Sequence, residues 1–592
     1  MVKGGLLGAS MLLGVTACTD DHFDISTGAV SSTSTIWENI EANSELDSVA
    51  MILSRIKVLR TETDYGTNKQ TYAELLNQPQ VFTAWLPIDG SFNAKYYLDK
   101  LDEAEEVYND SAAAGTLLFY DLQTQFAQNH LSRFNYESNT GEFQVRLMNT
   151  KLCNYDKSNG TFNGVSLNSN YTSIPSSNGV LHVLDGLSEY AYNIYDYWEN
   201  DTTLSDFYSV IAAYDTYTFS SSSSTEGTMN EEGQMVYIDS VFVYSNDLLT
   251  DAQADITNED SLFVAVLPTN AAYAQAKETV SSLYNYASSY AYEWSSSSDD
   301  FEYTGTNALR FDTDSLQELN TNQAILNAAF VSATSITGLT ASSDSATFVG
   351  AVMSADSLIT PARTIIYNKN SGGVNPIFDG KTPEKASNGY VFTVDNYNYD
   401  PAYSFISKSE IDASERNVAS LRNSTTASGT TVQLTSDNWN TEVELGGLLD
   451  DNTYYYFPVS GSSTMTIKFR LDDVLSGKYK VSIVMLPNRV NINNIRTDSD
   501  GEEIEETSTF DAKIIDDKGN DIASTVSNSV NQTAVERIVL WDSVEFPYCY
   551  ASLPDGYESF PILRLQLTRT QQTRGNSKAL SIAKIILEPV RE

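Results

Sequence analysis

Three short sequence landmarks occur twice along this chain, in the same order, and each recurs at a larger offset than the one before. Residues 36–38 are matched 158 positions later by residues 194–196. The run that begins at Phe82 recurs 181 positions later, and the run that begins at Asn178 recurs 210 positions later. Three ordered matches with widening spacing indicate two homologous domains, the second lengthened by insertions.

Each landmark predicts a local structure. Apolar residues at nearly helical spacing across 36–53 predict an amphipathic helix that opens the domain. The Phe-x-Ala-x-x-Pro segment at 82–87 predicts a buried strand that the proline ends, because proline cannot donate to a sheet. Asp89 and its counterpart Asn270 are predicted to cap the helix that follows them. The Asn-Gly pair at 178–179, followed by apolar residues, predicts a tight turn that leads into a strand.

These landmarks resemble the two signature boxes of the fasciclin domain, over about residues 35–402. The matching residues of the first copy are Phe82, Pro87, Asp89, His130, Asn178, Gly179, His182 and Asp185. Those of the second copy are Phe263, Pro268, Asn270, Asn388, Gly389 and Asp395. Phe392 replaces the second histidine there, so this copy departs further from the family. The resemblance implies compact α/β domains with a β-sandwich or wedge, in a family that mostly mediates adhesion and extracellular binding.

From about residue 403 the sequence changes character. Short runs with strand-like alternation, bounded by turn residues, lie at 465–471, 479–485, 510–515, 562–567 and 580–587. Such a series predicts an antiparallel β-sandwich. It resembles the jelly rolls of carbohydrate-binding modules in architecture only. The predicted fold class is therefore α+β: two tandem fasciclin-like α/β domains at 35–192 and 193–402, then a jelly-roll-like sandwich at 403–592.

The N-terminal sequence predicts export and a lipid anchor. Residues 1–17 resemble a signal peptide whose apolar run is too short to span a bilayer. The run ends Val-Thr-Ala-Cys, which resembles a bacterial lipobox and implies that Cys18 is acylated. The acidic residues after Cys18 resemble the surface-export signal of Gram-negative bacteria with Sus-type uptake systems. Residues 18–34 are then a lipidated tether, and the expected location is the outer face of the outer membrane.

Composition excludes several classes of function. Asp and Glu number 78 against 35 Lys and Arg, a formal net charge of -43, which repels nucleic acid and anionic lipid surfaces. With three Cys and three His, a disulfide framework or a multi-Cys metal site is excluded, and no cofactor is predicted. An Asp-rich stretch at 498–501 lacks calcium ligands at the first and last loop positions. It predicts a solvated acidic hairpin tip, and no metal site is expected.

The histidines and aromatic clusters are the remaining candidates. His182 and Asp185 suggest proton transfer, but we favour a His182 that packs inside and bonds a neighbouring loop, with His130 as its candidate contact. Candidate ligand-binding rings, with core or interface packing as the alternative, are Tyr284, Tyr286, Tyr290, Tyr292, Trp294, Tyr454, Tyr455 and Tyr456. A further cluster at 190–198 is expected to pack at the junction of the first two domains.

The sequence thus favours a non-catalytic, surface-exposed lipoprotein of the outer membrane. It would be an accessory binding subunit of a Sus-type uptake complex for glycans or peptides, beside a TonB-dependent transporter and its substrate-binding lipoprotein. The alternative is an adhesin that binds host matrix or neighbouring cells through its fasciclin domains. An enzyme, such as a glycosidase in the C-terminal region, is the least favoured hypothesis.

Overall fold

The computed structural model describes residues 33–591, apart from 60–69, 137–139, 230–234, 288–291, 296, 298–299, 304–310, 337–338, 340–344, 368–376, 379, 398, 461–463, 517, 556, 558 and 569–577. Cys18 and the predicted signal peptide therefore lie outside the described residues. The chain divides into two compact units, one of residues 1–192 and 219–242, the other of residues 193–218 and 243–592. Apart from residues 219–242, the second and third predicted domains thus share one unit.

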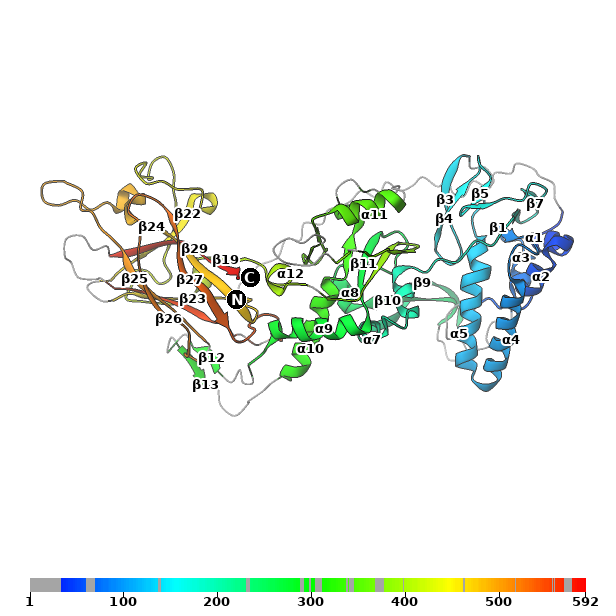
Figure 1. Ribbon diagram of the computed structural model, residues 1–592, viewed down its shortest axis with the longest axis horizontal. Coiled ribbons are helices and arrows are strands. Elements are labelled where there is room, and N and C mark those ends of the chain that lie inside the picture. The colour runs from blue at the N-terminus through cyan, green and yellow to red at the C-terminus, as the bar shows by residue number, and fades with distance from the viewer. Residues whose placement is uncertain are drawn as a thin grey trace. The chain divides into compact units, whose positions relative to one another are not determined.

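A four-stranded sheet lies at the centre of the first unit (Figure 1). Its strands, in spatial order, are β2 (Leu131–Ser132), β1 (Phe82–Pro87), β8 (Gly179–Leu184) and β7 (Ile174–Ser176). β1 is wholly buried, as predicted, and it is parallel to β8. The helices are α1 (Ile36–Glu41), α2 (Asp47–Leu53), α3 (Tyr72–Leu76), α4 (Ala94–Asp110) and α5 (Ala112–Leu122). A second sheet consists of β3 (Glu142–Arg146), β4 (Leu152–Asp156), β5 (Thr161–Phe162) and β6 (Val165–Ser166).

The second unit begins with a sheet of the same order and strand directions. Its strands are β14 (Phe330–Ser332), β11 (Phe263–Pro268), β18 (Gly389–Val394) and β17 (Glu384–Ala386). The helices of this region are α6 (Ile194–Asn200), α7 (Ser205–Ala212), α8 (Asp247–Asp251), α9 (Asn270–Ser281), α10 (Thr313–Asn327), α11 (Ser345–Ser354) and α12 (Pro401–Ser404). The repeat seen in the sequence is therefore a repeat of strand order and register.

A glycine fixes that register in each copy. Gly179 pairs with Phe82 and Gly389 pairs with Phe263, each directly after the tight turn that the Asn-Gly pair predicts. A Cβ atom at Gly179 would lie 1.8 Å from the Phe82 carbonyl oxygen, and one at Gly389 would lie 2.0 Å from that of Phe263. Both glycines also have positive φ angles, 137° and 155°. The close backbone approach, together with φ, excludes larger residues.

The opening helix prediction was wrong in one respect. The segment 36–53 forms two helices, α1 and α2, because Asn43 caps a new turn and its side chain accepts the backbone N–H of Glu45. The predicted apolar face is confirmed, since Ile36, Ile40, Leu46, Val49 and Ile52 are fully buried.

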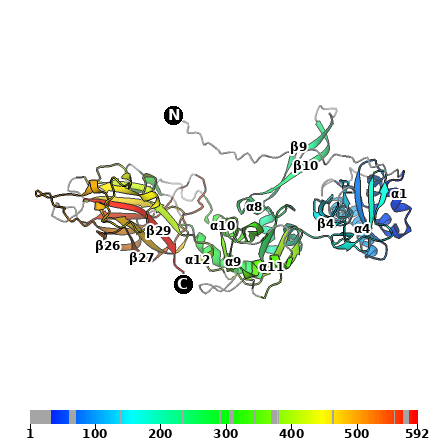
Figure 2. The same cartoon turned by 90° about the horizontal axis from the view of Figure 1, so that it is seen from above.

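Two insertions account for the growing offsets. The long ribbon of β9 (Asp215–Met229) and β10 (Met235–Asn246), seen in Figure 2, follows α7 and precedes α8 in the sequence. At the equivalent point of the first unit, the described residues contain a β-bridge between Lys57 and Thr71. The second insertion separates α9 from α10, whereas Ser111 alone separates α4 from α5. It contains the hairpin of β12 (Tyr292–Ser295) and β13 (Asp300–Tyr303).

The C-terminal region is built from two antiparallel sheets with a common core. The first sheet has the order β21 (Thr430–Gln433), β22 (Thr453–Pro458), β29 (Ala579–Pro589), β24 (Gly477–Leu486) and β27 (Glu536–Phe546), with β19 (Ser409–Asp412) also on β29. The second has the order β20 (Val418–Arg422), β23 (Thr466–Arg470), β28 (Ile562–Leu567), β25 (Thr509–Ile515) and β26 (Asp521–Ser529). The five predicted runs are all strands here. The chain as a whole is α+β, with mostly antiparallel sheets.

The segment after α9 joins the first region of this unit to the sandwich. The Asn285 side chain donates to the Pro547 carbonyl at 2.7 Å, and the Cys549 N–H donates to the Asn285 carbonyl at 2.8 Å. The Tyr286 hydroxyl donates to the Ala551 carbonyl at 3.1 Å, and its ring packs with Cys549. The second insertion thus also attaches the first region of this unit to the sandwich.

Candidate functional site

Each signature asparagine stabilises the copy to which it belongs. In the first copy, the Asn178 side chain accepts the N–H of Ile36 at 2.8 Å and donates to the carbonyls of Leu76 and Gln78. In the second copy, Asn388 accepts the N–H of Ile194 at 2.9 Å and donates to two carbonyls in the same way. Both side chains are buried. Each asparagine therefore ties the first helix and the segment before the central strand to the turn.

Asp89 and Asn270 do not cap the helices that follow them, so that prediction was wrong. Asn93 caps α4 and Thr269 caps α9. The Asp89 carboxylate instead accepts the N–H of Ser48 at 3.2 Å, at the start of α2. The Asn270 side chain accepts the N–H of Asp206 at 3.0 Å, at the start of α7. These earlier helices have leucine at the N-cap position and lack a cap of their own.

Both described histidines are buried and bonded to backbone carbonyls. His130 Nδ1 lies 2.7 Å from the Phe126 oxygen, and His182 Nδ1 lies 2.5 Å from the Thr172 oxygen. Burial lowers the pKa of each ring to about 4. The bonded ring therefore stays neutral at pH 7, in agreement with the packed His182 that we expected.

His182 forms neither the disfavoured pair with Asp185 nor the candidate contact with His130. The Asp185 carboxylate accepts the Asn168 amide at 2.7 Å, and His182 packs against the rings of Trp85 and Tyr155. His130 makes its ring contact with Phe126 instead of His182. In the second copy Phe392 is fully buried, and its ring lies 4.5 Å from that of Phe378. Proton transfer between His182 and Asp185 is not supported by this geometry.

The remaining signature residues also contribute to the structure of the domains. Phe82, Pro87, Phe263 and Pro268 belong to the two buried central strands. In the second copy the Asp395 carboxylate forms an ion pair with Lys381.

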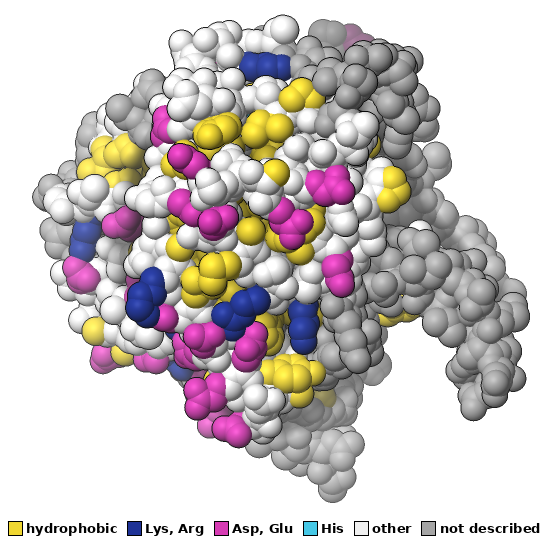
Figure 3. All heavy atoms as spheres, turned by 90° about the vertical axis from the view of Figure 1, so that its right-hand side faces the viewer, with side chains coloured by type: hydrophobic (Ala, Val, Ile, Leu, Met, Phe, Trp, Pro, Cys, Tyr) yellow, Lys and Arg dark blue, Asp and Glu magenta, His cyan; other side chains and the backbone are white. Residues whose placement is uncertain are grey.

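On the face of the first unit drawn in Figure 3, acidic and basic side chains are mixed with apolar ones, and no histidine is visible among the described atoms.

Several candidate aromatic residues are not accessible to a ligand. Tyr454 is fully buried, and Tyr286 is 6% exposed in the contact with the sandwich, so neither ring has a face for stacking. Tyr284 is half-buried and packs against the same contact. Tyr455 and Tyr456 lie on β22 and are half-buried. Tyr292 and Trp294 lie on strand β12, and Tyr290 lies outside the described residues.

A cluster that sequence reasoning missed lies at the base of the β9–β10 ribbon. The Asp215 carboxylate accepts the hydroxyls of Tyr195 and Tyr244 and the amide of Asn246, the last two at 2.8 and 2.7 Å. Burial, followed by the bond to Asp215, raises the pKa of both tyrosines. Tyr195 therefore belongs to the interior of the second copy. No local pattern connects these four positions.

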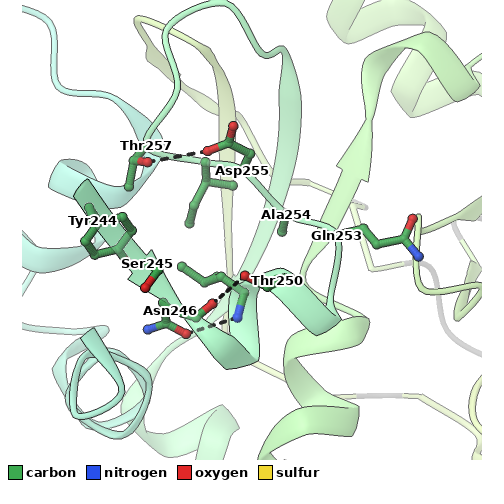
Figure 4. A pocket seen from close by; sticks show the side chains of 10 residues that line it. Tyr244, Ser245, Asn246, Thr250, Gln253, Ala254, Asp255 and Thr257 are labelled. Atoms are coloured by element: carbon green, nitrogen blue, oxygen red, sulfur yellow. Dashed lines mark hydrogen bonds between the residues drawn. The ribbon is translucent and has the colours of Figure 1, made fainter. Parts of the chain in front are cut away.

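A hollow of about 370 Å³ lies beside this cluster (Figure 4). Tyr244 lines one side, and Thr257 and Asp255 lie together on the rim, with the Thr257 hydroxyl directed toward the Asp255 carboxylate. The ring of Tyr217, a residue 64% exposed, lies 5.5 Å from that of Tyr244. Tyr217 is not part of the lining, so the hollow combines one aromatic ring, that of Tyr244, with hydroxyl and carboxylate groups. A larger hollow of about 760 Å³ lies beside α11 and is lined mostly by small residues.

Two negative findings apply to the residues that the structure describes. Among them, no group of three His, Cys, Asp or Glu side chains is placed to hold a metal ion. No described helix combines the length and the apolar character needed to cross a membrane.

The Asp-rich stretch is a hairpin tip, as predicted: the Asp498 carboxylate accepts the backbone N–H groups of Asp500 and Glu502.

Comparison with known proteins gives only distant likenesses. No family model and no curated protein matches the chain. A cyclase from Fischerella sp. TAU is 12% identical over 31% of this chain and 100% of its own, with a TM-score of 0.18. An isomalto-dextranase from Arthrobacter globiformis T6 is 12% identical over 31% of this chain and 23% of its own, with a TM-score of 0.16. The exo-beta-1,3-galactanase of Phanerochaete chrysosporium is 11% identical over 33% of this chain and 34% of its own, also with a TM-score of 0.16.

The chain spans only about a fifth of the first solved chains it matches, 19% of a bacteriophage CBA120 tailspike and 23% of the dextranase. TM-scores this low do not define a common overall fold.

Proposed function

We propose that this chain is a non-catalytic binding protein of the outer cell surface, anchored through Cys18. It acts as an accessory subunit of a Sus-type TonB-dependent complex that takes up glycans or peptides. Its partners are the transporter and the transporter's substrate-binding lipoprotein. The lipobox-like sequence and the fasciclin-like landmarks support this location and role.

One observation carries the non-catalytic part of the proposal. In both copies, polar signature side chains are engaged in holding the fold: the asparagines bind three backbone groups each, and Asp89 and Asn270 bind the start of a neighbouring helix. His182, the residue most suited to proton transfer, is buried and bonded to a backbone carbonyl. These residues support a scaffold whose surface does the binding.

We assign ligand recognition to the hollow beside Tyr244. The ring of Tyr244, with that of Tyr217 next to it, offers a flat apolar face, and the adjacent hydroxyl and carboxylate groups offer hydrogen bonds, a combination suited to a sugar or a peptide side chain. A binding screen of glycans and peptides with Tyr217→Ala tests this assignment. Tyr96→Ala is the matched control, because Tyr96 is a 50% exposed tyrosine on α4. We expect only the first variant to lose binding.

Purification from detergent-solubilised outer membrane tests the role in uptake. We expect a TonB-dependent transporter to co-purify in stoichiometric amounts with the wild-type chain, and no outer-membrane fraction for Cys18→Ala. Binding to matrix proteins without a transporter would instead indicate an adhesin. Turnover of a glycan or peptide that is lost on changing one carboxylate would indicate an enzyme.

A further inference from the structure

The five-stranded sheet of the sandwich has one face in the core and one facing outward. Along β23, β28 and β25, residues alternate between buried and partly exposed, as expected for a sheet with one covered face. The outward positions carry mainly charged and amide or hydroxyl side chains. This face therefore differs from the opposite sheet, whose outer face is covered by a second apolar cluster around Tyr454.

Three basic residues form a row across this outward face. Lys468 on β23 is directly opposite Arg564 on β28, and Arg564 is directly opposite Lys513 on β25. Directly opposed residues point to the same side of the sheet, with Cβ atoms about 5 Å apart. Like charges at such positions repel each other. The row is unexpected in a protein of net charge -43.

The charge at the centre of the row is not compensated. Lys513 forms an ion pair with Asp521 at 2.6 Å, but within the described residues no carboxylate lies at ion-pair distance from Arg564. The Arg564 guanidinium instead donates to the neutral Gln566 side chain at 2.9 Å. Its other donors are therefore available to an anion, and a guanidinium binds a carboxylate through two parallel hydrogen bonds.

The residues around the row are suited to a hydroxyl-rich ligand. Thr466 lies opposite Gln566 in the next row, and Gln566 lies opposite Asp511. Amide, hydroxyl and carboxylate groups therefore adjoin the basic centre, and they match the alternating hydroxyls and carboxylates of an acidic sugar polymer. Residues 403–592 carry 18 basic and 27 acidic side chains. The sandwich as a whole therefore still repels dense polyanions such as nucleic acid.

We propose that the row Lys468–Arg564–Lys513 is a binding face for a carboxylated polysaccharide, one built from uronic acid units. This proposal rests on the proposed function in its glycan form. It adds a second binding face, on the sandwich, and names the class of glycan that this face binds. Arg564 binds a sugar carboxylate, the two lysines add attraction along the row, and the neighbouring polar side chains bind hydroxyls. The ligand lies across the strands, along the row.

Binding of polygalacturonate to the detergent-solubilised full-length chain tests the proposal, with the fully methyl-esterified polymer as the neutral probe. We expect the acidic polymer to bind, and Arg564→Gln to weaken its affinity about tenfold or more, the loss of one charged hydrogen-bonded contact. Lys480→Gln is the matched control, because it removes the same charge from the other sheet of the sandwich. We expect that control to change affinity less than twofold, about the effect of a screened, distant charge.

Three outcomes would overturn the proposal: equal binding of the esterified polymer, equal losses for Arg564→Gln and Lys480→Gln, or tighter binding of a single-stranded oligonucleotide than of polygalacturonate. Circular dichroism of both variants establishes that a loss does not reflect unfolding. Failure here leaves the uptake role intact if the transporter still co-purifies. Absence of the transporter, with polymer binding retained, removes the uptake role and leaves this face in place.

Discussion

The side-chain oxygen of Asn270 accepts the backbone N–H of Asp206 at 3.0 Å, across 64 positions of sequence. It thereby caps α7, whose N-cap residue Leu204 has no side-chain acceptor. Asp89 does the same for α2 in the first copy. A helix cap supplied from the end of a buried strand links two elements that neither local sequence would place together.

Removal of this cap should destabilise the second copy. We expect Asn270→Ala to lower the free energy of unfolding by about 1 kcal/mol, the usual contribution of an N-cap side chain. Asn270→Asp should retain most of the stability that the cap contributes, because the Asp89 carboxylate caps α2 in the same way in the first copy. Urea denaturation of the three proteins measures the difference. An equal loss for both variants would show that the side-chain amide and not the cap matters.

Gly389→Ala should be far more harmful than an ordinary glycine replacement. The new Cβ atom would lie 2.0 Å from the Phe263 carbonyl oxygen, so the paired strands must separate. We expect a loss of about 3 kcal/mol, as for severe overpacking. Gly350→Ala is the control, since Gly350 lies within α11 with nothing within 4 Å of its Cβ position. That change should be neutral or stabilising by up to about 1 kcal/mol.

Acid should destabilise the first unit through its histidines. Burial lowers the pKa of His130 and His182 to about 4, below the ordinary 6.5, so the unfolded chain binds more protons between these pH values. Stability from these rings is therefore complete above pH 6.5 and is lost as pH falls to about 4, by about 3 kcal/mol for each histidine.

His182→Phe isolates one of these contributions, because Phe392 occupies the same strand position in the second copy. We expect the loss of unfolding free energy between pH 7 and pH 4 to be smaller in the variant than in wild type by about 3 kcal/mol. Denaturation curves at several pH values provide the measurement. An unchanged pH dependence would contradict the role of burial at His182.

Arg564→Gln should not weaken the fold. Its removal relieves repulsion from Lys468 and Lys513, and we expect the free energy of unfolding to stay the same or rise by up to about 1 kcal/mol. Thermal unfolding of the variant and of wild type compares them. A clear loss of stability would mean that Arg564 serves the sheet itself and would weaken the case for a binding face.

The sequence was sufficient to predict those parts of the fold in which close packing restricts a few positions to particular residue types. The repeated strands were predictable because Gly179 and Gly389 leave no room for a side chain, and the sandwich strands because their faces alternate. Strand β26 was missed, since its segment Asp521–Ser529 is rich in Ser, Thr and Asn and has little apolar alternation. The sequence resembles a fasciclin protein, and that family assignment stays a prediction.

The candidate sites were harder to predict, for a physical reason. Asp215 meets Tyr195, Tyr244 and Asn246 only after the ribbon folds, and no spacing rule relates positions so far apart. In the sequence, Tyr286 and Tyr454 look the same as exposed tyrosines that could stack on a ligand. Only the structure shows that both are buried. The row around Arg564 requires the pairing register of three strands, which alternation alone does not define.

The contact of Asn285 and Tyr286 with the sandwich determines where this protein can be divided. A fragment that stops at residue 402 would expose the ring of Tyr286 and leave the Asn285 carbonyl without the Cys549 N–H. A fragment that starts at residue 403 would expose Cys549 to oxidation. Biochemists who wish to study the sandwich alone will therefore need to include the segment that follows α9.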